Sequence, residues 1–171
     1  MNEGSEITLE QMLYARDLRA AKQKHLIEKC GLPLVSFTVN TPGQRKNTPV
    51  SRSIFHEGCD VLTKILDMKG ISPVYFEICK PDTGYEAYFL VDADVHILKA
   101  HMCQIENTHP LGRLFDFDVI GQEGSITREA LGYPKRKCLI CGQDAHACAR
   151  SRQHSVPELQ EKILKMTKAY F

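Results

Sequence analysis

The segment from residue 86 to residue 120 constrains the fold more than any other part of the chain. It begins with the apolar run EAYFLV, continues with apolar side chains at helical spacing over residues 92–110, and ends with the aromatic and β-branched run LFDFDVI. This order of strand, helix and strand is typical of a sheet covered by helices. We therefore predict an α/β or α+β fold built on one small mixed sheet flanked by helices.

Capping motifs indicate helices at both ends of the chain. Thr8 and Gln11 form a capping box that starts a helix running to about residue 30, and Ser155 with Glu158 starts another that runs to about residue 170. Asp92 is the predicted N-cap of the helix that follows EAYFLV. The remaining predictions are a strand at LPLVSFTVN, a loop at TPGQRKNTP, a helix over residues 51–68 and a strand at PVYFEI.

Composition and charge narrow the classes of function. The 171 residues are 43% hydrophobic and 25% charged, which predicts a single domain over residues 1–171. A net charge of +1 argues against a bulk nucleic-acid or membrane binder. Residues 128–154 nevertheless hold six Lys or Arg against two acids. Such a local excess indicates either a site for an anionic ligand or partner or a solvated surface.

The cellular setting is also predicted from composition. The beginning, MNEGSEIT, is acidic and lacks a hydrophobic signal segment, and no apolar run approaches the length that crosses a membrane. We expect a cytoplasmic protein. The seven cysteines are then free thiols or metal ligands rather than a disulfide framework.

Two carboxylates in LFDFDVI raise a physical question. Asp116 and Asp118 occupy alternate positions of a strand, so they point to the same face. At about 5 Å and an effective dielectric near 20 they repel each other by roughly 3 kcal/mol. A divalent metal such as Mg²⁺ cancels this repulsion and can hold phosphate oxygens at its other positions. The alternative interpretation is an edge strand with one solvated face.

Residues around this pair extend the predicted site. Arg113 follows a turn whose Gly112 allows close backbone approach, and it is well placed to contact phosphates if the turn folds over the aspartates. Asp94 is a weaker candidate because acids at the start of a helix commonly cap it. The carboxylates that remain open as a third metal ligand are those of Glu77, Asp94, Glu123 and Asp144.

The segment RKCLICGQDAHACARSRQHS combines thiols with bases. Cys138, Cys141 and Cys148, with His146 and His154 nearby, offer enough ligands for a structural zinc, and the alternative interpretation is a set of buried thiols. Three bases follow that could bind phosphates or remain as solvated charge: Arg150, Arg152 and His154. Glycine-rich phosphate loops, H-E-x-x-H and nucleophile elbows are absent, so phosphate chemistry here would need metal and arginine.

Several motifs together resemble the apo-citrate lyase phosphoribosyl-dephospho-CoA transferases, the holo-acyl-carrier-protein synthases of citrate lyase. They are PLVSFTVNTPG, TGYEA, VDADVHILK, HPLGRLFDFDV and LGYPKRKCLICGQDAHACARSRQHS, in the expected order along nearly the whole chain. A D-x-D strand after a helix is also similar to the metal-binding pair of polymerase-β-like nucleotidyltransferases. The Gly-Ser pair of that fold is missing, with Val91-Asp92-Ala93 in its place.

The resemblance implies a group-transfer reaction. Triphosphoribosyl-dephospho-CoA would donate its phosphoribosyl-dephospho-CoA part to a serine of the acyl carrier subunit of citrate lyase, with release of pyrophosphate. Mg²⁺ on Asp116 and Asp118 and phosphate contacts from Arg113, Arg150, Arg152 and His154 fit this chemistry. Carrier subunits of this kind tend to be acidic, so the basic tail could bind the carrier instead. The rival hypothesis is a noncatalytic, zinc-stabilised module that binds a carrier protein or nucleic acid.

Overall fold

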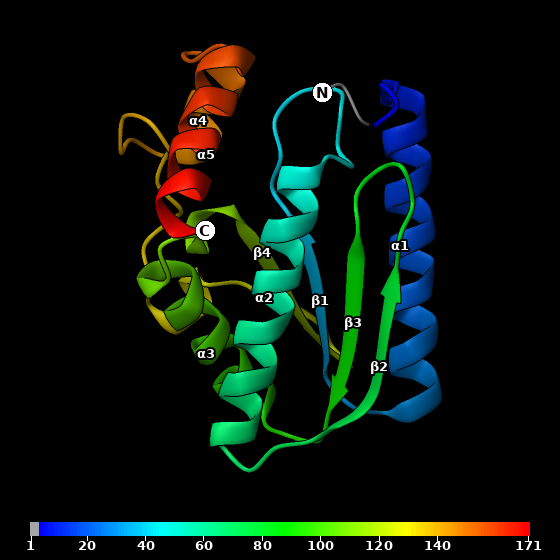
Figure 1. The fold of residues 1–171 in the computed structure, drawn as a ribbon. Coiled ribbons are helices and arrows are strands. Elements are labelled where there is room, and N and C mark those ends of the chain that lie inside the picture. The colour runs from blue at the N-terminus through cyan, green and yellow to red at the C-terminus, as the bar shows by residue number, and fades with distance from the viewer. Residues whose placement is uncertain (1–3) are drawn as a thin grey trace.

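The computed structural model describes residues 4–171, which form a five-stranded sheet with helices on both faces (Figure 1). The strands are β1 (Leu34–Val39), β2 (Pro73–Cys79), β3 (Glu86–Val91), β4 (Phe115–Gly121) and β5 (Gly124–Ile126). The helices are α1 (Leu9–Cys30), α2 (Pro49–Met68), α3 (Val95–Thr108), α4 (Ala145–Ser151) and α5 (Val156–Tyr170), with short 3-10 turns at Gly112–Leu114 and Glu129–Leu131. The predicted α/β class is confirmed.

The strand order is β2-β3-β1-β4-β5, and every pair of neighbours is antiparallel. The sheet is therefore antiparallel and not mixed as predicted, although β3, α3 and β4 do form the predicted strand-helix-strand unit. β3 and β4 do run parallel to each other, since each is antiparallel to β1. They are not neighbours, because β1 lies between them and takes both sets of hydrogen bonds.

Capping side chains determine where the helices begin. The predicted capping boxes of Thr8 and Ser155 are both present. The prediction that Asp92 caps α3 is wrong: the cap is Asp94, whose Oδ1 accepts hydrogen bonds from the backbone N–H groups of His96 and Ile97 at 2.9 and 3.0 Å. Both residues fit the sequence pattern, and the helix begins at the later one. A capping box at Thr48 likewise starts α2 two residues before the predicted position.

A cluster of stacked aromatic rings forms the centre of the core between the sheet and α2. Phe37 of β1 stacks on Phe117 of β4 at 4.4 Å and on Phe55 of α2 at 5.3 Å between ring centroids. Gly58 lets α2 approach this cluster, because a Cβ there would lie 2.2 Å from the Phe37 ring. The same close packing fixes the face of β4 that the aspartates must occupy.

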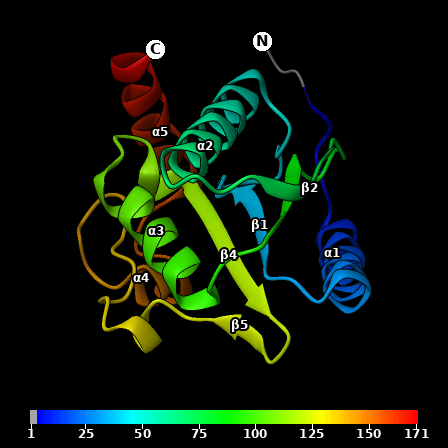
Figure 2. The same ribbon diagram turned by 90° about the horizontal axis from the view of Figure 1, so that it is seen from below.

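The opposite face of the sheet is covered by α1, and this interface is mostly polar (Figure 2). Within α1 only Leu26 and Ile27 are buried, and they pack against Leu34, Tyr88 and Leu90. Towards its N-terminus the helix presents long polar side chains to the strands.

Across residues 4–171, no helix combines the length and apolar character that crossing a membrane requires.

Candidate active site

Asp116 and Asp118 lie on the polar face of β4, as predicted. Phe115, Phe117 and Val119 point into the core and are buried, whereas the two aspartates point to the other face. In the register with β1, Asp116 pairs with Thr38 and Asp118 with Ser36. The aspartates therefore sit beside hydroxyl side chains on the face that α1 covers.

Two buried side chains of α3 hold this part of β4 from its other edge. The short strand β5 pairs only with the end of β4, from Val119 onward. At Phe117 the side chains of α3 replace a neighbouring strand: Lys99 Nζ donates to the Phe117 carbonyl at 2.9 Å, and Glu106 Oε1 accepts from the Phe117 amide at 3.1 Å. The backbone between the two aspartates is thus anchored by a cation and an anion.

Arg136 is the direct partner of the first aspartate. Its Nη1 lies 2.9 Å from Asp116 Oδ1, and its Nη2 donates to the backbone carbonyls of Phe115 and Arg113. A guanidinium that contacts a side chain and the backbone of the same strand fixes the carboxylate in one orientation. One carboxylate of the pair is therefore oriented by an arginine, while the other is exposed.

Asp118 is exposed, but nearby protein atoms still raise the pKa of its carboxyl. Neighbouring protein removes water from the carboxylate, although part of the side chain reaches solvent, and this raises its pKa above the usual aspartate value. The negative charge of Asp116 raises the pKa further. Asp116 is thus close enough for its charge to act on Asp118, as expected from their alternate positions on the strand.

A basic cavity of about 150 Å³ opens beside Asp116, between the first half of α1, the loop after β1 and the start of α2. Four cationic residues line it, namely Arg16, Arg19, Lys46 and Arg52, together with the single carboxylate of Asp116. Such an excess of positive charge next to one carboxylate suits a polyphosphate whose bound cation contacts the aspartates.

These cations differ in how the protein holds them. Arg19 Nε forms an ion pair with the buried Glu86 at 2.9 Å, and Lys46 Nζ donates to the Thr41 carbonyl at 2.6 Å. Burial lowers the pKa of Lys46, and the charge of Arg16 lowers it further. Arg16 makes no hydrogen bond or ion pair with any residue in the described part of the chain, so its guanidinium is available to a ligand.

The basic residues predicted from sequence lie elsewhere. Arg113 does not line the cavity, and its Nη2 donates to the Lys137 carbonyl. Arg150 and Arg152 are exposed at the end of α4 and just beyond it. His154 lies with the thiols of Cys138, Cys141 and Cys148, and the ligand atoms of these four residues are all within 4.8 Å of one another. This Cys3His cluster can bind zinc, as the sequence indicated for its cysteines.

The carboxylates that the sequence left open as a third metal ligand lie elsewhere in the structure. Asp94 and Asp144 cap α3 and α4, and Glu77 pairs with Lys22 at 2.7 Å on β2, three strands away from β4. Glu123 lies in the turn between β4 and β5. Within residues 4–171 the Cys3His cluster is the one group of three or more metal-ligating side chains, so a cation on the aspartates would have two protein ligands.

Sequence reasoning missed the cations that line the cavity. Arg16 and Arg19 are three residues apart on α1 and were visible only as part of a polar helix face. Lys46 and Arg52 flank the capping box at Thr48, which folds the loop back against the strands. The weak apolar pattern of α1 was the one available signal, because a helix that covers a sheet with few apolar residues must meet polar partners.

Comparison with known proteins places this chain in a family. Residues 7–170 match the family model described as apo-citrate lyase phosphoribosyl-dephospho-CoA transferase. A protein of Vibrio cholerae named probable apo-citrate lyase phosphoribosyl-dephospho-CoA transferase is 39% identical, over 96% of this chain and 93% of its own length. One of Citrobacter koseri named apo-citrate lyase phosphoribosyl-dephospho-CoA transferase is 35% identical over 90% of this chain and 84% of its own. Protein CitXG of Haemophilus influenzae is 37% identical over 94% of this chain, which corresponds to 35% of that longer protein.

Proposed function

The chain belongs to the apo-citrate lyase phosphoribosyl-dephospho-CoA transferase family, and from this premise we propose that it attaches the prosthetic group of citrate lyase. The donor is triphosphoribosyl-dephospho-CoA and the acceptor is a serine of the apo acyl carrier subunit. The serine oxygen forms a bond to the α-phosphorus, and the bond from that phosphorus to the bridging oxygen breaks. Pyrophosphate leaves, and the serine proton passes to solvent or a base.

The single observation that carries this proposal is the position of the aspartate pair at the basic cavity. Asp116 lines the cavity that Arg16, Lys46 and Arg52 also line, and Asp118 follows it on the same face of β4. The reaction separates a phosphoryl group from pyrophosphate, so negative charge develops on oxygens on both sides of the breaking bond. Cations fixed around that position stabilise the negative charge that develops on these oxygens in the transition state.

We assign Mg²⁺ to Asp116 and Asp118. The residues fit this ion, because magnesium in phosphate-handling enzymes is commonly held by one or two carboxylates and by substrate oxygens, with water in the remaining positions. When bound there, the ion would supply positive charge to the phosphoryl oxygens. Arg136 would keep Asp116 in its orientation, and Lys99 with Glu106 would hold the strand that carries both ligands.

In our proposal the cationic side chains of the cavity bind the triphosphate of the donor. The exposed arginines Arg150 and Arg152 bind the carrier. Arg16 and Arg19 reach the cavity from α1, whereas Lys46 and Arg52 reach it from the other side. In this assignment Arg113 does not contact phosphate. It binds the Lys137 carbonyl and so supports residues 128–154, which we call the basic segment. Arg150 and Arg152, being exposed, contact the acidic carrier surface, and complementary charge of this kind speeds and orients docking.

The test is to incubate the protein with apo carrier, triphosphoribosyl-dephospho-CoA and Mg²⁺ and to determine the mass of the carrier. The expected result is a gain equal to the phosphoribosyl-dephospho-CoA group, with pyrophosphate released in equal amount. A carrier of unchanged mass would contradict the proposal. Pyrophosphate release in the absence of carrier would instead identify a phosphohydrolase that uses water.

Two variants locate the chemistry within the protein. Asp118→Asn removes a metal ligand without a large change in shape and should abolish transfer, whereas transfer at the normal rate by this folded variant would exclude the metal role.

Arg16→Gln should raise KM for the donor by about 10- to 100-fold, as expected for the loss of a hydrogen bond between charged groups. Lys24→Gln is the matched control, because Lys24 lies on an exposed part of α1 outside the cavity lining.

A further inference from the structure

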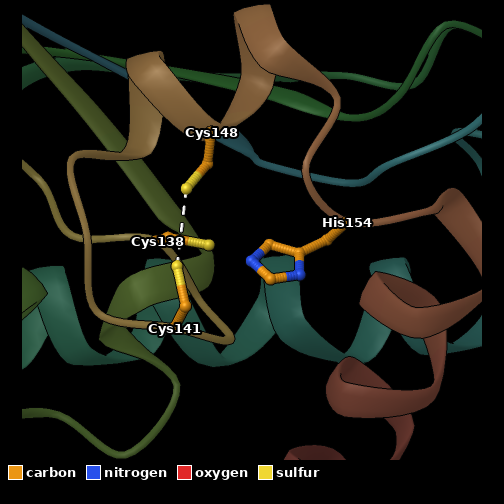
Figure 3. A group of neighbouring side chains, drawn as sticks. All are labelled: Cys138, Cys141, Cys148 and His154. Atoms are coloured by element: carbon orange, nitrogen blue, oxygen red, sulfur yellow. Dashed lines mark hydrogen bonds between the residues drawn. The ribbon is translucent and has the colours of Figure 1, made fainter.

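The chain brings four metal-ligating side chains together from three separate turns of the basic segment (Figure 3). Cys138 and Cys141 lie on a tight hairpin, Cys148 lies on α4, and His154 lies just before α5. Tetrahedral zinc, with bonds of about 2.3 Å to sulfur and 2.0 Å to nitrogen, spaces its ligands by roughly 3.5 to 3.8 Å. The ligand atoms here are all within 4.8 Å of one another, and the Cys141 and Cys148 sulfurs are 3.4 Å apart.

The backbone around the first two cysteines is shaped as a metal-binding turn. The Cys138 amide donates to the Gln143 carbonyl at 2.6 Å, and the Gly142 amide donates to the Cys138 carbonyl at 3.3 Å. Gly142 adopts a left-handed conformation with φ of 72°, which closes the turn.

The other two ligands are brought back to this hairpin by a reversal of the chain after α4. Asp144 caps α4 through the Ala147 amide at 2.8 Å, and this places Cys148 towards the hairpin. Arg152 has a left-handed conformation with φ of 49°, and it is the only described residue other than glycine with a positive φ. This strained position turns the chain so that the His154 ring faces the three thiols (Figure 3).

A buried nitrogen without a partner gives an independent indication of a ligand. His154 Nε2 is inaccessible to solvent and has no hydrogen-bond partner within the described residues. Buried polar atoms are rarely left without a hydrogen-bond partner, so one that the chain leaves unpaired indicates a bound water, ion or other ligand. A neutral imidazole nitrogen that faces three sulfurs is a zinc ligand in many structural sites.

We propose that Cys138, Cys141, Cys148 and His154 form a tetrahedral structural zinc site that holds the basic segment against β4. The hairpin is attached to β4 by Arg113, which donates to the Lys137 carbonyl, and by Arg136, which binds Asp116. Through the metal, the same hairpin is tied to α4 and to the start of α5. Zinc bound there would therefore help to position Arg136 on Asp116 without contacting substrate. This inference concerns metal content and does not depend on the proposed reaction.

The first measurement is the zinc content of the full chain purified under reducing conditions without chelator, by plasma mass spectrometry. We expect one zinc per chain, and Cys141→Ser and His154→Ala should each lose it. Cys30→Ser and His146→Ala are matched controls that should retain it. Cys30 is an exposed thiol that is distant in the sequence from the cluster, and His146 is exposed on α4 outside the cluster. Retention of stoichiometric zinc by both ligand variants would overturn the assignment.

Cobalt substitution tests the ligand set in the wild-type chain, so the result does not depend on the folding of a variant. Chain depleted of metal and then given Co²⁺ should show sulfur-to-cobalt charge-transfer absorption and the intense visible bands of tetrahedral coordination. His154→Ala should alter those bands, whereas His146→Ala should not. Failure of the reduced wild-type chain to take up either metal, or a metal-free chain with Cys141 and Cys148 joined in a disulfide by intact mass, would refute the proposal.

Discussion

At the scale of single residues, the site is governed by how each charge is compensated. Asp116 is paired with Arg136, Arg19 with Glu86, and Lys46 with a backbone carbonyl. Asp118 and Arg16 are the charges left for a ligand: one is a carboxylate beside a second negative charge, and the other is a guanidinium at the cavity. In the proposed assignment, a metal-bound polyphosphate would compensate both charges at once.

The raised pKa of Asp118 predicts how metal affinity depends on pH. Protonation of this carboxyl begins at a higher pH than for an ordinary aspartate, and Mg²⁺ must displace that proton to bind. Affinity for Mg²⁺ should therefore fall as pH is lowered towards this pKa and should level off above it. Calorimetric titration of Mg²⁺ with donor present, at a series of acidic to neutral pH values, measures the effect.

The control for this prediction is Asp118→Asn, which should bind Mg²⁺ weakly and with a flatter pH dependence. If wild-type affinity stays constant across the acidic range, the proton and the metal do not compete for Asp118, and the assignment of this ligand is wrong.

At the scale of elements, the position of β4 is set from both sides. Its core face packs through Phe117 on Phe37, and its free edge is held by Lys99 and Glu106 of α3. Buried charges on α3 would be costly in an ordinary core. They bind a strand whose backbone has no neighbouring strand at that point, so they complete its hydrogen bonding.

Gly58→Ala tests how closely α2 must approach this arrangement. In an open helix position the change would stabilise the fold by about 1 kcal/mol. Here the new Cβ would lie 2.2 Å from the ring of Phe37, which is stacked between Phe55 and Phe117 and cannot yield easily. We expect a net loss of about 2 kcal/mol in the free energy of unfolding, measured by urea denaturation.

The comparison for this variant is Asp60→Ala on the exposed side of α2. It should stay within about 0.5 kcal/mol of the wild type, as is usual for surface changes. An unchanged or increased stability of Gly58→Ala would mean that α2 shifts freely and that its contact with Phe37 does not fix the sheet.

At the scale of the whole molecule, the cavity belongs to no single segment. It is lined from α1, from the loop after β1, from α2 and from β4, which are up to about a hundred positions apart in the chain, as Arg16 and Asp116 show. The basic segment does not line this cavity and is joined to the first residues of β4 by Arg113 and Arg136. In the proposed assignment, the donor would bind in the cavity and the carrier at the basic segment.

Charge reversal on the basic segment tests this division. Arg150→Glu combined with Arg152→Glu should raise KM for the carrier roughly tenfold at low salt, with a smaller effect as salt is added. KM for the donor should not change, since neither residue lines the basic cavity. Steady-state kinetics with each substrate varied in turn provides the measurement.

Lys168→Glu is the matched charge reversal, because Lys168 is exposed near the far end of α5. An equal rise in KM from this control would indicate a general effect of net charge. A rise in donor KM from the Arg150 and Arg152 changes would place these residues at the triphosphate instead.

The sequence by itself determined most of the local elements and the strand face that Asp116 and Asp118 share. Alternation in LFDFDVI was sufficient to put Asp116 and Asp118 on one face, and the capping boxes of Thr8 and Ser155 were sufficient to start two helices, because these signals involve residues only two or three positions apart. The tertiary structure decided which distant cations reach the aspartates and which do not. Arg16 and Lys46 reach the cavity through the packing of α1 and the loop after β1, whereas Arg113 and His154 are held by the basic segment. The position of each of these basic side chains depends on contacts between segments that are remote in the sequence, and no local pattern encodes those contacts.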